Sequence, residues 1–158
     1  PRHRRRLLGG VKLVAHIDGA SRGNPGPAST GVFVQDAAGK TLREHGRRLG
    51  TQTNNVAEYT ALLDALAIAK SLGAAELLVR SDSLLLVKQV TGEYRVKNAG
   101  LAALKAKAVA LLKGFKAVRF EHVRRELNKD ADRLANEALD GLRDDQPVCG
   151  DAAQGLLF

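Results

Sequence analysis

Residues 16–27 read His-Ile-Asp-Gly-Ala-Ser-Arg-Gly-Asn-Pro-Gly-Pro, where an alternating apolar run is followed by a turn-forming segment. Every second residue from Val11 to Ile17 is apolar, which predicts a strand over 11–18. The glycines, asparagine and prolines that follow predict a tight turn. Asp18 therefore lies at the predicted tip of a strand, where an acidic residue either opens the turn or serves a metal or a reaction. The other acidic residues of the chain decide between these two interpretations.

The composition predicts a single globular domain with a nucleic-acid partner. The chain has 158 residues, of which 44% are hydrophobic and 27% charged, as is typical of a domain with a real core. Its 25 Lys and Arg residues outnumber its 17 Asp and Glu residues, for a formal net charge of +8. This excess favours a polyanionic partner, nucleic acid ahead of an anionic membrane, and the alternative is a merely basic surface. Because only 4% of the residues are aromatic, phosphate contacts would dominate over base stacking.

Cysteine usage and hydropathy bear on the compartment. The single cysteine, Cys149, argues against a disulfide framework and a thiolate metal site. No apolar run approaches the roughly 18 residues that a membrane span needs, and the basic residues 1–6 are not followed by a signal-peptide core. We therefore expect a soluble, cytoplasmic protein with no membrane partner, acting as a monomer.

Periodicity divides the chain into a basic arm, one folded domain over 11–142 and a tail. Residues 1–10 are Arg-rich and predict a flexible arm, and residues 143–158 predict a tail that is mobile unless Leu156-Leu157-Phe158 packs back on the body. Alternating or buried apolar runs predict strands over 11–18, 30–36, 41–49, 75–81 and 116–123. Helical spacing predicts helices from Thr53 to just before Gly73, over 83–90, over 101–113 and over 128–142, the last capped by Asn128.

The predicted order of elements is βββαβααβα. Three strands joined by short turns form an antiparallel meander, with 37–40 as the hairpin between the second and third. Later strands joined by helices then make an α/β fold, in which a five-stranded mixed sheet is flanked by helices on both faces. Ligand sites in such sheets form at strand ends and adjoining helix starts.

Four acidic residues fall where this fold could bring them together. Asp18 follows the first strand, Asp82 follows the fourth strand beside it, and Glu58 and Asp132 lie in the first turns of two helices. Clustered carboxylates repel one another, and a divalent cation removes that cost. Oxygen ligands favour Mg²⁺ or Mn²⁺, and two such ions about 4 Å apart can cleave a phosphodiester. Each acid alone could instead be a helix cap or a surface charge.

Four motifs in register carry a family resemblance. They are Asp18-Gly-Ala-Ser-Arg-Gly-Asn-Pro-Gly-Pro27, Thr53-Asn-Asn-Val-Ala-Glu58, Ser81-Asp-Ser83 and Asn128-Lys-Asp-Ala-Asp-Arg-Leu-Ala135. Their order and spacing over residues 11–142 resemble the type 1 ribonuclease H family. The resemblance implies the ribonuclease H fold and two-metal cleavage of the RNA strand of RNA/DNA hybrids, with 5′-phosphate and 3′-hydroxyl products. It also implies a metal-binding catalytic quartet of Asp18, Glu58, Asp82 and Asp132.

Polar residues around these motifs are candidates for substrate contact. Thr53 and Asn54 stand at the start of a helix, where they can hold a phosphate or simply cap the helix, and the resemblance implies a DNA phosphate. The resemblance also implies that Asn24 and Asn55 meet the minor groove of the hybrid, where 2′-hydroxyls distinguish RNA from DNA. Gly23 would let the backbone approach that groove, although turn geometry alone explains it.

The residue that precedes the last aspartate of the quartet as a cation differs between members of the family. Several members carry a histidine there, whereas others use arginine. His122 and Arg125 precede Asp132 by ten and seven residues, and Arg125-Glu126 resembles the arginine pattern. Arginine can steer a phosphate but cannot act as a base at neutral pH. We favour Arg125 over His122 as the catalytic cation, and the alternative for either is a cation at a strand edge.

The segment 91–98 is too short to hold the basic handle that some family members carry. Substrate contacts would then be redistributed to Tyr94, Arg95, Lys97, Lys105, Lys107 and the Arg-rich arm, unless these residues are simply solvated. The sequence thus predicts a metal-dependent endoribonuclease acting on RNA/DNA hybrids. The alternatives are another nuclease on the same fold and a non-catalytic hybrid-binding module.

Overall fold

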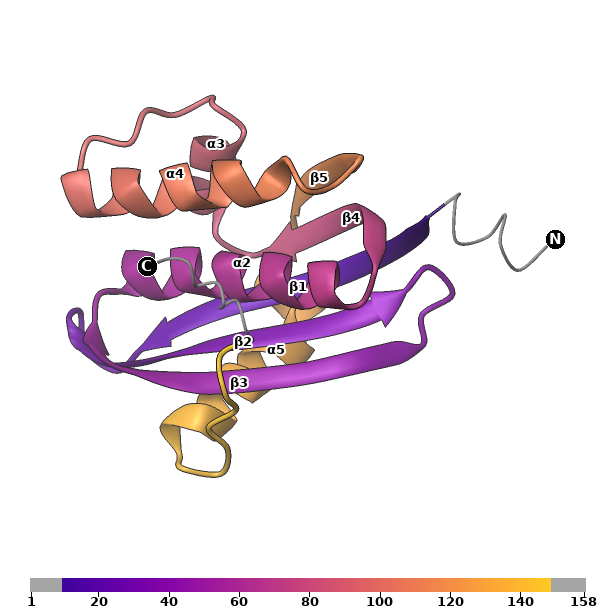
Figure 1. Cartoon of the computed structure of the whole chain (residues 1–158). Helices are drawn as coiled ribbons and strands as arrows, with labels where there is room; N and C mark the ends of the chain where they lie inside the picture. Colours follow the sequence, from indigo (N-terminus) through magenta and orange to yellow (C-terminus); the bar gives the residue numbers. More distant parts are fainter. Residues whose placement is uncertain (1–9, 149–158) are drawn as a thin grey trace, which may run out of the picture.

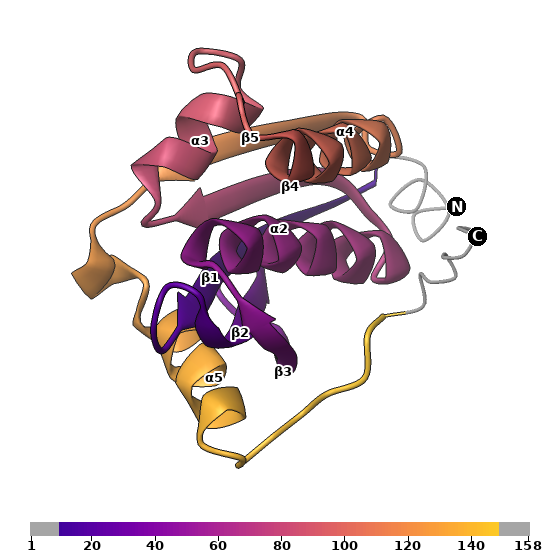
Figure 2. The ribbon, with the colours of Figure 1, turned by 90° about the vertical axis from the view of Figure 1, so that its left-hand side faces the viewer.

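The structure is a computed structural model that describes residues 10–148, and it is built on one five-stranded sheet (Figures 1 and 2). The strands are β1 (Val11–Ser21), β2 (Gly26–Asp36), β3 (Thr41–Gln52), β4 (Ala74–Ser81) and β5 (Ala117–His122). The helices are α2 (Asn54–Ser71), α3 (Leu84–Val90), α4 (Ala99–Leu112) and α5 (Lys129–Leu139), with a 3-10 turn, η1 (Arg125–Leu127), before α5. The predicted order of strands and α-helices is confirmed.

The sheet is mixed, as predicted. Its strands lie in the order β3-β2-β1-β4-β5. β2 is antiparallel to both β1 and β3, whereas β4 is parallel to both β1 and β5. β1 is therefore the central strand, with an antiparallel neighbour on one side and a parallel neighbour on the other.

Several strands are longer than predicted, and this changes the place of Asp18. β1 continues to Ser21 because its pairing with β2 runs on as far as Ser21↔Ala28. Its parallel pairing with β4 stops at Ile17↔Ser81. The prediction that Asp18 lies at the tip of the first strand is thus wrong. Asp18 lies within β1, at the first position beyond the end of its pairing with β4.

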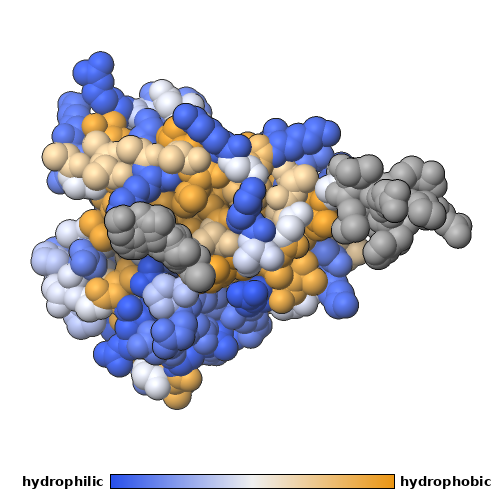
Figure 3. Space-filling view, in the orientation of Figure 1, coloured by the Kyte–Doolittle hydropathy of each residue, from blue (hydrophilic) through white to orange (hydrophobic). Residues whose placement is uncertain are grey.

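Helices cover both faces of the sheet, as predicted (Figure 2). α2 covers the face on which alternate β1 residues, Leu13, Ala15 and Ile17, are fully buried. α4 packs beside α2, and Figure 3 shows apolar residues gathered over these two helices. α5 lies on the opposite face, in backbone contact with β2. A Cβ on Gly31 would stand only 2.1 Å from the Ala131 carbonyl oxygen, so this close contact requires glycine. None of the helices between residues 10 and 148 has both the length and the apolar character needed to cross a bilayer.

The chain after α5 returns along the outer edge of β3. The Asp145 N–H donates to the Gly46 carbonyl at 2.8 Å, and the Asp145 carboxylate accepts from the Gly46 N–H at 3.0 Å. Asp144 Oδ1 accepts from the Arg48 N–H at 2.9 Å. These bonds occupy backbone groups that an edge strand otherwise leaves open.

This packing differs from the expectation of a mobile tail from Arg143 onward. Asp144 and Asp145 are held on β3, and Val148 packs against the core. The predicted flexible arm, Cys149 and the Leu156–Phe158 segment lie outside the described residues.

Candidate active site

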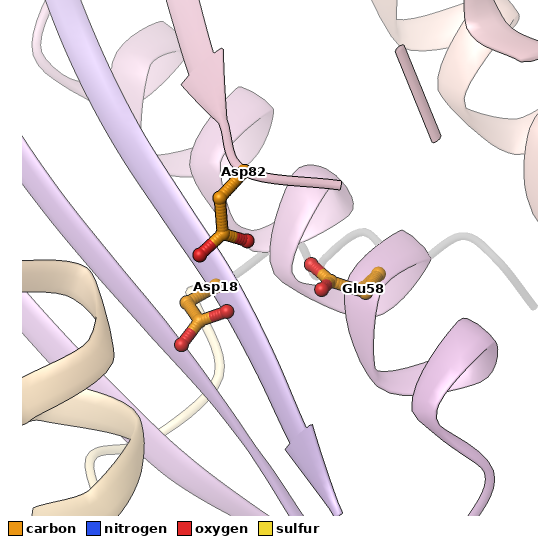
Figure 4. Close-up of side chains that lie close together, drawn as sticks. All are labelled: Asp18, Glu58 and Asp82. Atoms are coloured by element: carbon orange, nitrogen blue, oxygen red, sulfur yellow. The ribbon is translucent and has the colours of Figure 1, made fainter. Parts of the chain in front are cut away.

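Three carboxylates meet where β4 ends (Figure 4). Asp18 projects from β1, Asp82 directly follows β4, and Glu58 comes from the second turn of α2. One oxygen of each carboxylate lies within 4.8 Å of an oxygen of the other two. The structure therefore brings together three of the four acidic residues that the sequence singled out.

Glu58 is positioned by a close approach between α2 and β1. The Gly19 N–H donates a 3.1 Å hydrogen bond to Glu58 Oε1. A Cβ at position 19 would stand only 2.3 Å from the Ala57 carbonyl carbon and from the Glu58 nitrogen. Glycine at this position therefore lets the helix backbone lie directly on the strand, which carries the Glu58 carboxylate to Asp18.

Asp132 approaches the group from the other face of the sheet. It lies in the first turn of α5, and its side chain is near enough to Asp18 to raise the pKa of that carboxyl. It is not one of the three carboxylates that lie within 4.8 Å of one another. All four nonetheless line a single cleft of about 610 Å³.

The protein surroundings make the charged form of these carboxylates costly. Burial, followed by repulsion from Glu58, Asp82 and Asp132, raises the pKa of Asp18 to about 9. Burial and repulsion from Asp82 raise the pKa of Glu58 to about 8. Burial also raises the pKa of Asp82, although Arg125 and Asn128 act in the opposite direction. An oxygen-only group with this unrelieved repulsion fits a hard divalent cation.

Both candidate cations of the sequence lie at the cleft. His122 is the last residue of β5, opposite Ser81, and Arg125 begins the 3-10 turn that follows. A 2.9 Å hydrogen bond from the Val123 N–H to the Ser81 carbonyl keeps the chain after β5 beside Asp82. Both cations lower the pKa of Asp82, and Arg125 contributes more than His122.

The predicted substrate residues near the N-terminus of α2 lie beside the cleft. Asn54 lines it, and its N–H donates to Asn24 Oδ1 at 3.1 Å. Thr53 caps the helix, because its hydroxyl accepts from the Val56 N–H at 3.3 Å. Asn55 is exposed, and Gly23 lies in the turn after β1 with a φ of 106°.

Tyr94, Arg95 and Lys97 do not reach the carboxylates. Tyr94 and Arg95 line a separate groove of about 770 Å³ beside α4, together with Lys105. Lys97 is exposed in the same loop. Any contact that these residues make with a substrate is therefore remote from the carboxylate cleft.

Sequence reasoning missed several residues that line the cleft. Asn136 lies four residues after Asp132, so helical spacing alone puts the two on one face of α5. Arg22 belongs to the turn after β1, and its guanidinium pairs with Asp140 at 2.7 Å. Arg124 lies next to Arg125 in the chain. Of these three residues, only Asn136 could have been found from the sequence, through its helical spacing from Asp132.

The predicted capping role of Asn128 is wrong. Asn128 occupies the N-cap position of α5, but its side chain makes no hydrogen bond to the helix. Its amide Nδ2 instead donates to the Ile17 carbonyl in β1 at 2.8 Å. The tertiary contact with β1 wins over the local cap because Asn128 is buried against that strand, with an exposed fraction of 1%.

Known proteins are similar to this chain in both sequence and fold. Residues 16–138 match the family model described as reverse transcriptase-like. The bifunctional protein Rv2228c of Mycobacterium tuberculosis is 43% identical over 145 residues, which are 91% of this chain. The chain spans only 40% of the length of that relative.

Solved structures agree with this match. RNase H1 from Halobacterium salinarum superposes with a TM-score of 0.81 and 43% identity, over 82% of this chain and 98% of that one. LC11-RNase H1, solved in complex with an RNA/DNA hybrid, gives a TM-score of 0.79 and 41% identity, over 82% and 98% of the two chains. With the carboxylates gathered at the end of β4, these matches show that the chain belongs to the type 1 ribonuclease H family.

Proposed function

We propose that this protein is an endoribonuclease that hydrolyses the RNA strand of RNA/DNA hybrids and leaves 5′-phosphate and 3′-hydroxyl ends. The observation that carries the proposal is the close group of Asp18, Glu58 and Asp82 in a cleft that Asp132 also lines. The hybrid bound to LC11-RNase H1 and the net charge of +8 support a hybrid substrate.

Asp18, Glu58, Asp82 and Asp132 would hold two Mg²⁺ or Mn²⁺ ions, since the group offers only hard oxygen ligands. When bound, such ions supply water activation and charge neutralisation at the leaving oxygen. The carboxylates themselves must be ionised to bind a cation. Burial first, and repulsion between the carboxylates second, raise the pKa values of Asp18 and Glu58, and a bound cation relieves the repulsion.

The other residues of the cleft would bind and orient the substrate. Asn54 stands at the N-terminus of α2, where the helix dipole favours a phosphate, and its backbone is held by Asn24. Gly23, Asn24 and Asn55 would face the minor groove, with Thr53 holding the helix start in place. Arg125 would steer the scissile phosphate, and His122 is the alternative that could also carry a proton.

The groove beside α4 would contact the hybrid backbone away from the scissile bond. Tyr94 and Arg95 line this groove and Lys97 is exposed in the same loop, so they offer two cations and one aromatic ring to phosphate and sugar. Monomeric state and cytoplasmic location remain predictions from the sequence.

The test is incubation of end-labelled RNA/DNA, RNA/RNA and DNA/DNA duplexes with Mg²⁺, Mn²⁺ or a chelator. We expect cleavage of the RNA strand of the hybrid alone, and none with the chelator. Asp18→Asn should abolish cleavage and retain hybrid binding. Asp36→Asn is the matched control, because Asp36 is the last residue of β2, outside the cleft, and an amide oxygen can still accept its two backbone hydrogen bonds.

The other outcomes identify the rival functions. Cleavage of duplex DNA but not of the hybrid would indicate another nuclease on this fold. Hybrid binding without cleavage under every cation would indicate a non-catalytic binding module. Full activity of Asp18→Asn would overturn the metal assignment.

A further inference from the structure

We propose that Asn128 is a positioning residue that holds β1 at Ile17, beside the end of β4, and the first turn of α5 in the arrangement that binds a divalent cation. The inference rests on the proposed metal-dependent function. It assigns to Asn128 a role in ion affinity that its position before a helix does not suggest.

Asn128 joins the segments that carry the carboxylates. Its amide donates to the carbonyl of Ile17, the residue directly before Asp18, at 2.8 Å. Its own carbonyl accepts from the Asp132 N–H at 3.2 Å. Its side chain also acts on the Asp82 carboxylate, whose pKa it lowers. Asn128 thus binds Asp132 and the residue before Asp18, and it lowers the pKa of Asp82.

The contact lies where the sheet stops holding these segments together. Parallel pairing between β1 and β4 ends at Ile17↔Ser81, so no ladder bond links Asp18 to Asp82. The Asn128 amide donates to the Ile17 carbonyl at this point. It therefore ties the start of α5 to β1 where the pairing between β1 and β4 has ended.

The side chain does nothing for its own helix. An asparagine before a helix ordinarily accepts hydrogen bonds from the first free amides through its side-chain oxygen. Asn128 makes no such bond, and its Oδ1 has no hydrogen-bond partner among residues 10–148. Burying a polar amide without full satisfaction is costly, so a leucine of similar size would be the ordinary occupant of this space. The amide nitrogen is the part of the side chain that the site uses.

The experiment measures cation binding directly, without substrate. Mg²⁺ and Mn²⁺ are titrated by calorimetry into the wild-type chain, Asn128→Leu, Asn128→Ser and Asn98→Ala. Asn98 is the matched control. Its side chain caps α4 by accepting from the Leu101 N–H at 3.0 Å, and it does not line the carboxylate cleft. Thermal melting with and without the ion is recorded for each protein.

We expect Asn128→Leu to weaken ion affinity by at least about tenfold, the lower end of the usual effect of residues that orient metal ligands. The rise in melting temperature on adding the ion should shrink in the same variant. Asn98→Ala should lower the melting temperature in the absence of ion and keep the wild-type ion affinity. Asn128→Ser, which is smaller and polar, serves if Asn128→Leu does not fold, and it should also bind the ion more weakly.

Two failures are distinguishable. A wild-type chain that binds neither ion would contradict the proposed function itself. Wild-type ion affinity in either folded Asn128 variant, with binding intact in the wild type, would overturn the positioning role and leave the proposed function standing.

Discussion

The Glu58 carboxylate accepts a 3.1 Å hydrogen bond from the Gly19 N–H, so that the residue after Asp18 holds a second carboxylate in place. The bond can form only because the backbone of α2 lies directly on β1. A Cβ at position 19 would overlap Ala57 and Glu58. The distance between two of the acidic groups therefore depends on a position without a side chain.

Gly19→Ala should separate Glu58 from Asp18. The added methyl forces α2 away from β1, which should cost about 1–3 kcal/mol of unfolding free energy, as overpacking does. A displacement near 1 Å at the site should lower kcat/KM for the hybrid by about 100-fold. Urea unfolding and steady-state kinetics check both effects. Gly100→Ala is the control, since its Cβ would meet only the Asn98 side chain at 3.2 Å, and an equal loss of activity there would contradict the argument.

Asp18→Asn should stabilise the cation-free protein, and increasingly so as the pH rises. The folded state raises the pKa of Asp18 from 3.8 to about 9, so between these values the folded chain binds the proton more tightly than the unfolded chain. The contribution of the protonated Asp18 side chain to stability is present at low pH and is lost as the pH rises toward 9. The neutral amide of the variant does not titrate and escapes this loss.

Chemical denaturation at several pH values measures this effect. In chelator, the variant should exceed the wild type by at least about 1 kcal/mol at pH 8, and by less at pH 5.5. Added Mg²⁺ should raise the stability of the wild type more than that of the variant. A stability difference that does not change with pH would contradict the assigned origin of the pKa shift.

Arg125→Ala should impair activity more than His122→Ala. Arg125 is the larger of the two positive influences on Asp82, and its loss removes both that influence and the phosphate contact proposed for it. A charged hydrogen bond of about 1.5–3 kcal/mol corresponds to a loss of about tenfold or more in kcat/KM. Arg125→Lys should keep part of the activity. Kinetics over pH 6–9 decide the matter, because a larger loss in His122→Ala, with a changed pH profile, would favour the histidine.

Arg95→Ala should weaken hybrid binding without changing the chemical step. Arg95 lines the groove beside α4, outside the carboxylate cleft, so its loss should leave kcat at saturating hybrid unchanged. The slope of log affinity against log salt should become shallower by about one unit if Arg95 contacts one phosphate. Binding measured over a range of salt concentrations tests this. Arg119→Ala is the control, because Arg119 in β5 lines neither the cleft nor the groove. An equal change of slope in that variant would assign the effect to net charge alone.

The element order and the sheet type followed from local patterns. Alternation in β1, helical spacing from Asn54 to Ser71 and glycines at element ends are readable without tertiary contacts, and the structure confirms the elements that they predict. Element ends were less well predicted, because β1 continues past Asp18 only where β2 supplies the hydrogen-bonding partners. Local sequence carries no information about where a neighbouring strand stops.

The four motifs identify Asp18, Glu58, Asp82 and Asp132 as the acidic candidates and assign them to elements whose ends could converge. How close these carboxylates lie depends on tertiary packing, because the backbone of α2 contacts Gly19 and that of α5 contacts Gly31. Only the tertiary structure turned Asn128 from a helix cap into a contact with β1, since a buried amide bonds whatever partner the packing presents. Spacing along the chain names the candidates, and packing between elements sets their separations.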